Sequence, residues 1–179
     1  MTFPTICFRP TQVADLPFVI SAEQHADNAP YVNQWSQQRH ESAIVAPDFG
    51  HFIVEFTGNN ALSINMHSIN APPVAVGYLI VSGLQDQNEV LLLNRIVIVQ
   101  KSKGYGRQAL RQLKVFTFEQ LGFHRLYMDV IASNQRAKAL YLSEGFVIEG
   151  TLREACKTDS GYEDMLMLSM LSTEVDPIK

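Results

Sequence analysis

The chain has 179 residues, of which 46% are hydrophobic and 18% are charged, a composition typical of one globular domain rather than of a disordered or fibrous chain. Its net charge of -4 excludes nucleic-acid binding that is driven by a general excess of positive charge. The charge is divided unevenly, since residues 1–90 hold two basic and eight acidic residues, whereas residues 91–179 hold twelve basic and ten acidic residues. Within a single domain, 1–179, we therefore expect the two halves to face different partners.

Neither the N-terminus nor the cysteines point to a secreted, membrane-bound or metal-binding protein. The first ten residues lack a basic segment followed by an apolar one, so we expect no signal peptide. The apolar run Val90–Val99 is interrupted, and it is shorter than the about 20 residues of a membrane span. Cys7 and Cys156 form no CxxC pair, and the histidines show no HxxH or HExxH spacing. We therefore expect buried, reduced thiols, no metal and a cytoplasmic location.

The N-terminal half alternates short strand and helix patterns. One helix is predicted to open at Asp15 and a second one is capped by Ser36, with a break at residues 28–30 between them. A turn is predicted at residues 58–60, and we interpret residues 61–73 as an insertion. The predicted strands of this half are Thr5–Arg9, His51–Phe56 and Val74–Gly83.

The C-terminal half continues with two further helices and four strands. The clearest helix covers residues 104–121, where apolar residues recur at helical spacing and Gly122 marks the end. Ser133 or Asn134 caps a shorter helix that ends before Gly145. We expect a frayed polar tail over residues 172–179. The predicted strands are Val90–Val99, Arg125–Ile131, Phe146–Cys156 and Tyr162–Leu171, and the whole order, β-α-α-β-β-β-α-β-α-β-β, predicts an α/β fold with a mixed sheet.

A glycine-containing turn, Lys101-Ser-Lys-Gly104-Tyr-Gly106-Arg107, joins the strand 90–99 to the helix 104–121. Free backbone N–H groups at a helix N-terminus bind phosphate, and glycine lets a ligand approach the backbone closely. A tight turn with a solvated basic face is the alternative for this stretch taken alone. Six of the 14 basic residues cluster near it, which suits a ligand with several phosphates: Arg95, Lys101, Lys103, Arg107, Arg111 and Lys114.

A dinucleotide-binding fold is a second interpretation of the same turn. Residues 104–109 fit GxGxxA, and Asp129 lies in the next predicted strand, the place of the ribose-binding acid in that fold. Two observations count against it. The motif follows four predicted strands instead of the first one, and only 50 residues follow Asp129, too few for the remaining elements of that fold.

A second motif runs from Asn134 to Phe146 and has the form Asn-x-x-Ala-x-x-Leu-Tyr-x-x-x-Gly-Phe. Together with the turn at 101–106, it makes the sequence resemble the GCN5-related N-acetyltransferases, most of all the branch of ribosomal-protein N-terminal and spermidine acetyltransferases. The resemblance covers residues 90–171 well and the N-terminal half mainly by element order. Lys101 stands where the family has Gln or Arg, and the strand before the turn lacks the family's common proline.

This resemblance implies a mostly antiparallel central sheet of about seven strands, flanked by about four helices. It also implies that residues 1–90 form the acceptor side, that residues 91–171 bind acetyl-CoA as co-substrate, and that no metal takes part. The backbone at Asn94, Arg95 and Ile96 would pair with the pantetheine arm, and Asn134 would bind near it. The pyrophosphate would lie against the turn made by Lys101, Ser102, Lys103, Gly104, Tyr105, Gly106 and Arg107.

The resemblance assigns Tyr141 as the acid that protonates the departing CoA thiolate, for which a phenol with a pKa of about 10 is suited. Asp129 is the candidate base, acting through a water, with a solvent-facing or structural aspartate as the equal alternative. We interpret Glu89 and Glu144 as exposed charges of turns. Cys156 is interpreted as a buried strand residue rather than a nucleophile.

The sequence thus predicts an N-acetyltransferase that moves the acetyl group to a primary amine by direct attack in a ternary complex. The acidic half favours a cationic acceptor: a polyamine, a protein N-terminus, an aminoglycoside or an amino-acid-like metabolite. A homodimer is compatible with this fold, and neither nucleic acid nor membrane is expected as a partner. The alternatives are an NAD(P)-binding oxidoreductase and a non-catalytic acyl-CoA-binding module.

Several residues of the acidic half are candidates for the acceptor site. Glu23, Asp27 and Glu41 are possible acceptor contacts, although a solvated helix surface is the favoured role for each. Three aromatic residues either line an apolar wall of the site or pack the helices against the sheet: Tyr31, Trp35 and Phe49.

Overall fold

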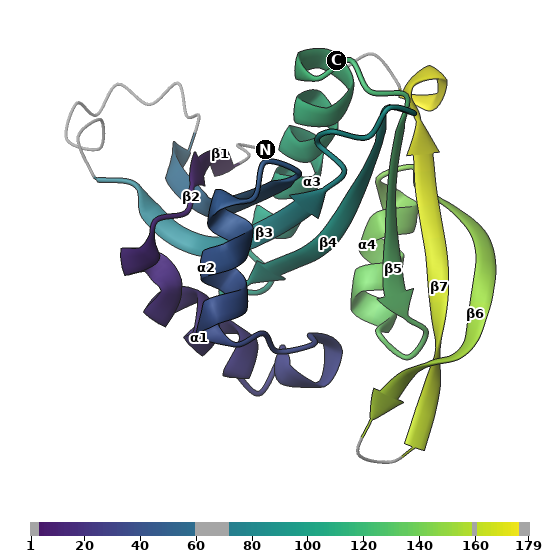
Figure 1. Cartoon of the computed structure of the whole chain (residues 1–179), viewed down its shortest axis with the longest axis horizontal. Helices are drawn as coiled ribbons and strands as arrows, with labels where there is room; N and C mark the ends of the chain where they lie inside the picture. The colour runs from purple at the N-terminus through teal and green to yellow at the C-terminus, as the bar shows by residue number, and fades with distance from the viewer. Residues whose placement is uncertain (1–3, 60–71, 159–160, 176–179) are drawn as a thin grey trace.

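The computed structural model describes residues 4–59, 72–158 and 161–175. Within these ranges seven strands form one sheet in the order β1-β2-β3-β4-β5-β7-β6, and all neighbouring strands are antiparallel except β4 and β5 (Figure 1). The predicted mixed, mostly antiparallel sheet is therefore confirmed, and the order is not that of a doubly wound dinucleotide fold. The strands are β1 (Pro4–Pro10), β2 (Phe49–Asn59), β3 (Val74–Ser82), β4 (Val90–Ile98), β5 (Arg125–Ile131), β6 (Val147–Thr158) and β7 (Gly161–Leu171).

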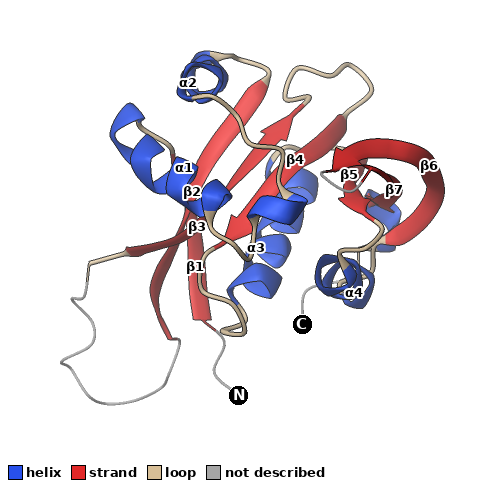
Figure 2. Ribbon diagram, turned by 90° about the horizontal axis from the view of Figure 1, so that it is seen from below, coloured by secondary structure: helices blue, strands red, loops and turns tan. Residues whose placement is uncertain are grey.

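Helices cover both faces of the sheet (Figure 2). Helices α1 (Leu16–Gln24) and α2 (Gln37–Val45) lie over one face, where Leu16 and Val19 are buried against Tyr78 and Ile80. The opposite face holds a second hydrophobic cluster, in which Leu110 and Leu113 are fully buried. That cluster is covered by α3 (Tyr105–Lys114), a π-helix that continues it (Val115–Gln120), and α4 (Gln135–Ser143).

The predicted helix ends agree with the structure. Ser36 caps α2 by accepting a hydrogen bond from the backbone N–H of Arg39, at 3.3 Å. Asn134 caps α4 in the same way, since its Oδ1 accepts from the N–H of Ala137 at 3.1 Å. Gly122 has a φ of +69°, the left-handed conformation that ends a helix. The two side chains accept hydrogen bonds from backbone N–H groups that the first turns of the helices leave unpaired, and Gly122 lets the chain leave the helix at its end.

Three predictions at strand ends are wrong. Gly58 and Asn59 do not form a turn but continue β2, paired with Thr5 and Pro4. The expected frayed tail begins with a 3₁₀ turn, Ser172–Glu174, in which Glu174 accepts from the N–H of Leu171. Cys7 and Cys156 are half-buried rather than buried, because β1 and β6 are the two edge strands. The insertion expected at 61–73 lies outside the described residues except for its last two, 72–73.

Candidate active site

The parallel strands β4 and β5 are paired over only three residues, where Val90–Leu92 lie beside Arg125–Tyr127. Just beyond, β4 carries a β-bulge. Val81 of β3 pairs with Leu93, and the preceding residue, Ile80, pairs with Arg95, so that Asn94 is an extra residue. A bulge bends its strand and increases the local twist. The two strands consequently part after Leu92, as Figure 1 shows, and we call the diverging segments, Leu93–Ile98 and Met128–Ile131, the strand fork.

Strand β4 leads from the strand fork into the glycine turn at the N-terminus of α3. Gly104 is the N-cap residue with a φ of +80°, and no side chain caps the helix. Ser102 also has a positive φ, +63°, and both residues are exposed. Backbone that alternates in this way makes a concave set of N–H groups, and an uncapped helix N-terminus adds partial positive charge. The turn therefore has the geometry that a pyrophosphate group requires.

Tyr105 and Gly106 both contribute to the packing of the turn. The ring of Tyr105 packs against Phe56 of β2, with ring centroids 5.3 Å apart. A Cβ atom added to Gly106 would lie 3.4 Å from the side chain of Leu140 in α4. Gly106 thus allows α3 and α4 to approach closely. The contribution of both residues to cofactor binding remains a prediction for their backbone groups.

The basic cluster predicted around the turn is not gathered on a ligand site. Arg107, Arg111 and Lys114 all turn toward the carboxylate of Glu144, at the end of α4, with Arg111 Nε at 3.1 Å and Lys114 Nζ at 3.3 Å. The side chain of Glu144 is only 3% exposed, so its interpretation as a surface charge is wrong. Burial by itself raises the pKa of Glu144, but hydrogen bonds from the two arginines and the charge of Lys114 outweigh it and lower the pKa.

Two further basic groups of this cluster also have internal partners. The guanidinium of Arg95 forms a buried ion pair with Glu23 and donates to the backbone carbonyl of Asn33, so its side chain does not reach the turn. The ammonium of Lys101 donates to Asn28 Oδ1, and burial lowers the pKa of Lys101. The prediction that these side chains bind phosphates is therefore wrong for Arg95, whereas cofactor binding by its backbone and by Lys101 stays a prediction.

Two cations remain exposed at the turn. Lys103 lies in it, and no residue in the described ranges accepts a hydrogen bond from its ammonium. Arg136, at the start of α4, lies with Nη2 at 3.4 Å from the Oγ of Ser102. The sequence reasoning missed Arg136, although it stands two residues after Asn134 in the second motif.

Tyr141 lies on α4 and is 7% exposed, with its ring 6.2 Å from that of Phe146. Its hydroxyl has no hydrogen-bond partner among the residues that the structure describes. Burial raises the pKa of Tyr141 to about 12, above the value of about 10 that the sequence suggested. The phenol is therefore firmly protonated at neutral pH, and its hydrogen is free to be donated.

Asp129 lies in the β5 arm of the strand fork, between the buried residues Met128 and Val130, and it is exposed. Partial burial raises the pKa of Asp129, and no other cause contributes resolvably. Asn94, in the β4 arm, is exposed too, and its Nδ2 donates to Ser82 Oγ at 2.6 Å. The fold thus brings Asn94 and Asp129, 35 residues apart in sequence, onto the two arms of one fork.

A buried polar cluster underlies the acceptor-side helices. Glu23 Oε1 accepts from the hydroxyl of Tyr78 at 2.6 Å, and Glu23 Oε2 accepts from the N–H of Trp35 at 3.0 Å. His40 Nε2 lies 3.2 Å from Glu23 Oε1, and His40 Nδ1 lies 3.0 Å from His51 Nε2. Glu23 is 1% exposed, so a solvated helix surface is the wrong environment for it. The members of this acceptor-side cluster are Thr11, Glu23, His40, His51, Tyr78 and Arg95.

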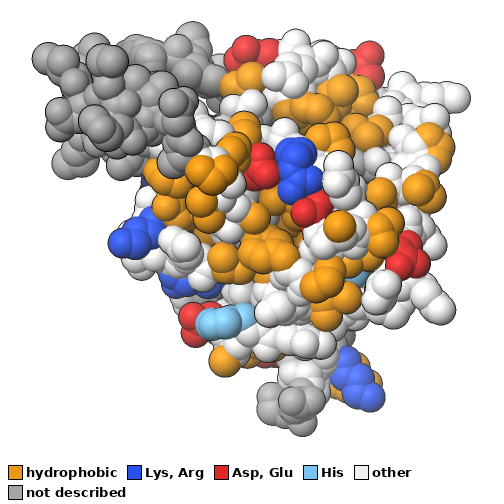
Figure 3. Space-filling view, turned by 90° about the vertical axis from the view of Figure 1, so that its left-hand side faces the viewer, with side chains coloured by type: hydrophobic (Ala, Val, Ile, Leu, Met, Phe, Trp, Pro, Cys, Tyr) orange, Lys and Arg blue, Asp and Glu red, His pale blue; other side chains and the backbone are white. Residues whose placement is uncertain are grey.

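Two further acidic residues of the N-terminal half have a cationic partner, whereas the side chain of Asp27 is 63% exposed. Arg9 bridges Asp15 and Glu55, with both contacts at 2.9 Å. On the side of the molecule that carries α1, β1 and β2, apolar side chains are spread between scattered charges (Figure 3). The acidic charge of the N-terminal half is thus used in part for ion pairs within the fold.

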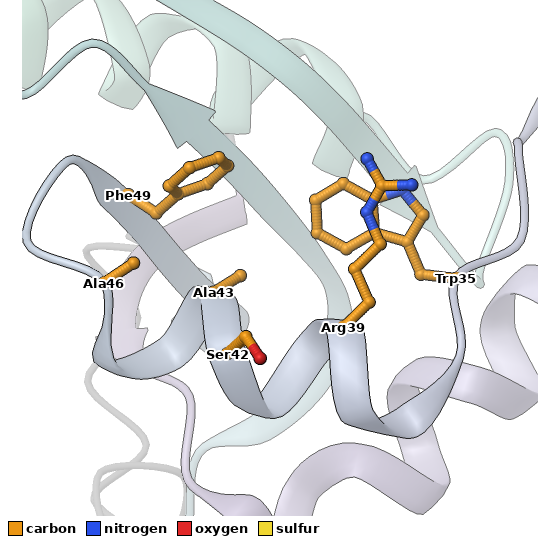
Figure 4. Close-up of a pocket in the computed structure, with 6 residues that line it drawn as sticks. All are labelled: Trp35, Arg39, Ser42, Ala43, Ala46 and Phe49. Carbon is orange, nitrogen blue, oxygen red and sulfur yellow. The ribbon is translucent and has the colours of Figure 1, made fainter.

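A small pocket lies between α2 and the start of β2 (Figure 4). Its volume is about 170 Å³. The guanidinium of Arg39 lies over the ring of Trp35, 4.1 Å from its centroid, and that of Arg95 lies 4.7 Å from the same centroid. We call it the α2 pocket, and its lining residues are Trp35, Arg39, Ser42, Ala43, Ala46 and Phe49. Trp35 and Phe49 therefore both line a wall and pack the helices, since both also join the cluster over β3.

The family model of the acetyltransferase (GNAT) domain matches residues 28–167 of the chain. The chain belongs to the GNAT family. The predicted family and fold are thereby confirmed, and the match includes the strand fork, the glycine turn and α4.

Individual relatives of this GNAT chain are spermidine acetyltransferases. Spermidine N(1)-acetyltransferase of Vibrio cholerae serotype O1 is 30% identical over 74 residues, which span 41% of this chain and 43% of that protein. The crystal structure of spermidine N-acetyltransferase from Vibrio cholerae in complex with CoA and spermine is similar, with a TM-score of 0.78 at 20% identity over 94% of this chain and 96% of that one. A chimera of the Vibrio cholerae enzyme SpeG and hSSAT is similar as well, with a TM-score of 0.77 and 20% identity over 94% and 96% of the two chains.

None of the helices in the described ranges is long and apolar enough to cross a membrane. In the same ranges no three His, Cys, Asp or Glu side chains are grouped so as to hold a metal ion.

Proposed function

We propose that this GNAT protein transfers the acetyl group of acetyl-CoA to a small primary amine by direct attack in a ternary complex. The observation that carries the proposal is the course of β4, which runs from its bulge at Asn94, along the open side of the strand fork, to the uncapped N-terminus of α3. From Asn94 to Val99 the strand advances about 17 Å, a length that an extended pantetheine arm spans. A pyrophosphate at the turn thus puts the thioester near Asn94.

The residues present fit acetyl-CoA. The N–H groups of Ser102 to Arg107 would hold the pyrophosphate, with the exposed charges of Lys103 and Arg136 beside it. Among the described residues, the backbone of Asn94 to Ile96 has no strand partner on the fork side, and it would pair with the pantetheine amides, near Asn134. CoA bound to the similar Vibrio cholerae enzyme supports this assignment. When bound, acetyl-CoA supplies the activated acetyl group.

In the proposed reaction, the lone pair of the neutral amine attacks the thioester carbonyl carbon, a C–N bond forms, and the C–S bond breaks. An N–H near Ile96 donates to the carbonyl oxygen as negative charge develops on it. Tyr141 donates its proton to the departing thiolate, and Asp129 takes the amine proton through a water. The products are the N-acetyl amide and CoA. Most of the rate gain comes from holding the two substrates together.

The experiment is a thiol-release assay with acetyl-CoA and a panel of amines. Tyr141→Phe should lower kcat by about 100-fold, the lower end of what general acid catalysis contributes, and leave the Kd for acetyl-CoA unchanged. Tyr162→Phe is the matched control, because Tyr162 on β7 is 64% exposed. An unchanged kcat in Tyr141→Phe refutes its role. Binding of acetyl-CoA without amine-dependent thiol release identifies an acyl-CoA-binding module instead.

A further inference from the structure

We propose that the acceptor is a small molecule of amino-acid type, whose carboxylate pairs with Arg39 and whose apolar side group fills the α2 pocket. This inference rests on the proposed function and deepens it by naming the class of acceptor. It departs from the polyamines that the acidic N-terminal half suggested. Four observations lead to it: the exposed charge of Arg39, the size and lining of the α2 pocket, the absence of a carboxylate from that lining, and the contacts that link the pocket to Asn94 of the strand fork.

Arg39 differs from most arginines of the described chain in its partners. Arg9, Arg95, Arg107 and Arg125 each form an ion pair with a carboxylate. Arg39 is exposed, lies over the Trp35 ring, and has no carboxylate partner within the described ranges. A guanidinium that lies over an aromatic ring and has no carboxylate partner can bind a carboxylate through two parallel hydrogen bonds.

The α2 pocket beneath this guanidinium is apolar and small. Trp35, Ala43, Ala46 and Phe49 supply its walls, and its volume is about 170 Å³ (Figure 4). An apolar cavity of roughly 150 Å³ holds a molecule of the size of benzene. The pocket therefore accepts a branched aliphatic or phenyl group, with the anionic group of the same molecule at Arg39.

A polycation would be repelled by the positive charges at the α2 pocket. The guanidinium groups of Arg39 and Arg95 both lie near the ring of Trp35. The nearest buried carboxylate, Glu23, is already bound by Arg95, Tyr78 and the backbone N–H of Trp35. A spermidine chain in the α2 pocket would thus bring positive charge to Arg39, and no carboxylate belongs to the lining of the pocket.

The α2 pocket is joined to the strand fork through β3. Phe49, in the pocket wall, pairs with Ser82, and Ser82 Oγ accepts the hydrogen bond of Asn94 Nδ2 at 2.6 Å. Trp35 contacts β4 directly, because the guanidinium of Arg95, the neighbour of Asn94, lies 4.7 Å from the centroid of its ring. In the proposal, the amine of an acceptor anchored in the pocket extends past Trp35 and Arg95 toward Asn94, where the proposed thioester ends.

The test measures kcat/KM of acetyl-CoA thiol release with four matched acceptors: leucine, leucinamide, glycine and spermidine. Leucine should exceed leucinamide by about 10- to 100-fold, the range that a hydrogen-bonded charge contributes. Arg39→Gln should remove this preference by lowering the value for leucine alone. Arg153→Gln, which removes an arginine from the exposed face of β6, is the control and should keep the preference.

A second variant tests the pocket itself. Ala46→Leu narrows it and should raise KM for leucine while leaving KM for glycine unchanged. Spermidine or leucinamide turned over as well as leucine, or an equal loss for both leucine compounds in Arg39→Gln, overturns the acceptor assignment but leaves the acetyltransferase proposal standing. If acetyl-CoA fails to bind, or no amine releases thiol, the proposed function itself is wrong.

Discussion

Each half of the molecule contains a carboxylate that the fold takes out of water, and the two carboxylates are neutralised in different ways. Glu23, in the acceptor-side cluster, is bound by Tyr78 and by Arg95, all of them buried. Glu144, at the end of α4, is 3% exposed, but its cationic partners on α3 are not buried: their side chains are 37%, 43% and 15% exposed. We call Glu144 with Arg107, Arg111 and Lys114 the α3–α4 cluster.

This difference determines in which cluster the loss of the carboxylate lowers the free energy of unfolding most. In the acceptor-side cluster the buried Arg95 is shielded from most contact with water, so removing its partner leaves an uncompensated charge. In the α3–α4 cluster the cations regain solvent when the carboxylate is removed. The first cluster therefore fixes the position of α1 and α2 rigidly, and the second one holds α3 to α4 with more tolerance.

The largest expected effect is that of Glu23→Ala. This substitution leaves Arg95 in the interior without its carboxylate partner. It should lower the free energy of unfolding by about 3–5 kcal/mol, measured by urea denaturation. Glu41→Ala is the control, because Glu41 on α2 accepts only an exposed hydrogen bond from Gln37. Its effect should stay within about 0.5 kcal/mol. Equal losses in Glu23→Ala and Glu144→Ala would break the comparison.

The next effect separates the two clusters by pH. Burial, with the charges of His40 and Arg95, lowers the pKa of His51 to about 4, whereas its ordinary value is 6.5. Between pH 6.5 and about 4, His51 is therefore protonated in the unfolded chain but neutral in the folded chain. The contribution of neutral His51 to the free energy of unfolding is complete above pH 6.5 and is lost as the pH falls toward 4. The loss amounts to about 3 kcal/mol. Urea denaturation at a series of pH values should show this slope in the native chain and not in His51→Gln.

Glu144→Gln should cost less, about 2 kcal/mol, since its charge-assisted hydrogen bonds weaken but its partners stay hydrated. The pKa of Glu144 is lowered in the fold from an ordinary value of 4.5, so its contribution is complete above that pH and is lost as the pH falls below it. The difference in unfolding free energy between the native chain and the variant should vanish in acid. A difference that persists there would mean that packing, not charge, holds α3 to α4.

The smallest effect is expected at an exposed pair that serves as the reference for both clusters. Arg125 donates to Glu149 at 2.7 Å, and the side chain of Glu149 is 35% exposed. The guanidinium and the hydroxyl of Ser169 lower the pKa of Glu149 to about 2. Solvent screens such a pair, so Glu149→Gln should cost at most about 1 kcal/mol in thermal or urea unfolding. A larger loss would remove the contrast between buried and exposed carboxylates.

Much of the fold followed from local patterns in the sequence. Interactions within a few residues of the chain can be predicted from the sequence alone. They include the caps at Ser36 and Asn134, the helix end at Gly122 and the glycine turn. The strand positions also held, because alternating apolar residues define a buried face. The family's two motifs gave the site its place on β4, α3 and α4.

The partners of charged side chains did not follow from the sequence. Glu23 and Arg95 are 72 residues apart, and Glu144 lies 37 residues from Arg107, so nothing local shows that they meet. The count of basic residues near the turn suggested a phosphate site, whereas most of those charges face carboxylates or amides elsewhere. The α2 pocket could not be predicted for the same reason. Arg39 differs from most other arginines in its lack of a carboxylate partner within the described ranges, and the sequence does not show which arginines form ion pairs.

The bulge in β4 makes the shape of the candidate site depend on a single residue, Asn94. Asn94 has no counterpart in β3, so the bend that separates β4 from β5 depends on one added residue. In genetic terms, an in-frame deletion of a single codon would restore an unbroken ladder with β3 and leave the alternation of faces beyond it intact. Such a chain would keep its core and its sheet, and would lose the open backbone edge on which acetyl-CoA is proposed to lie.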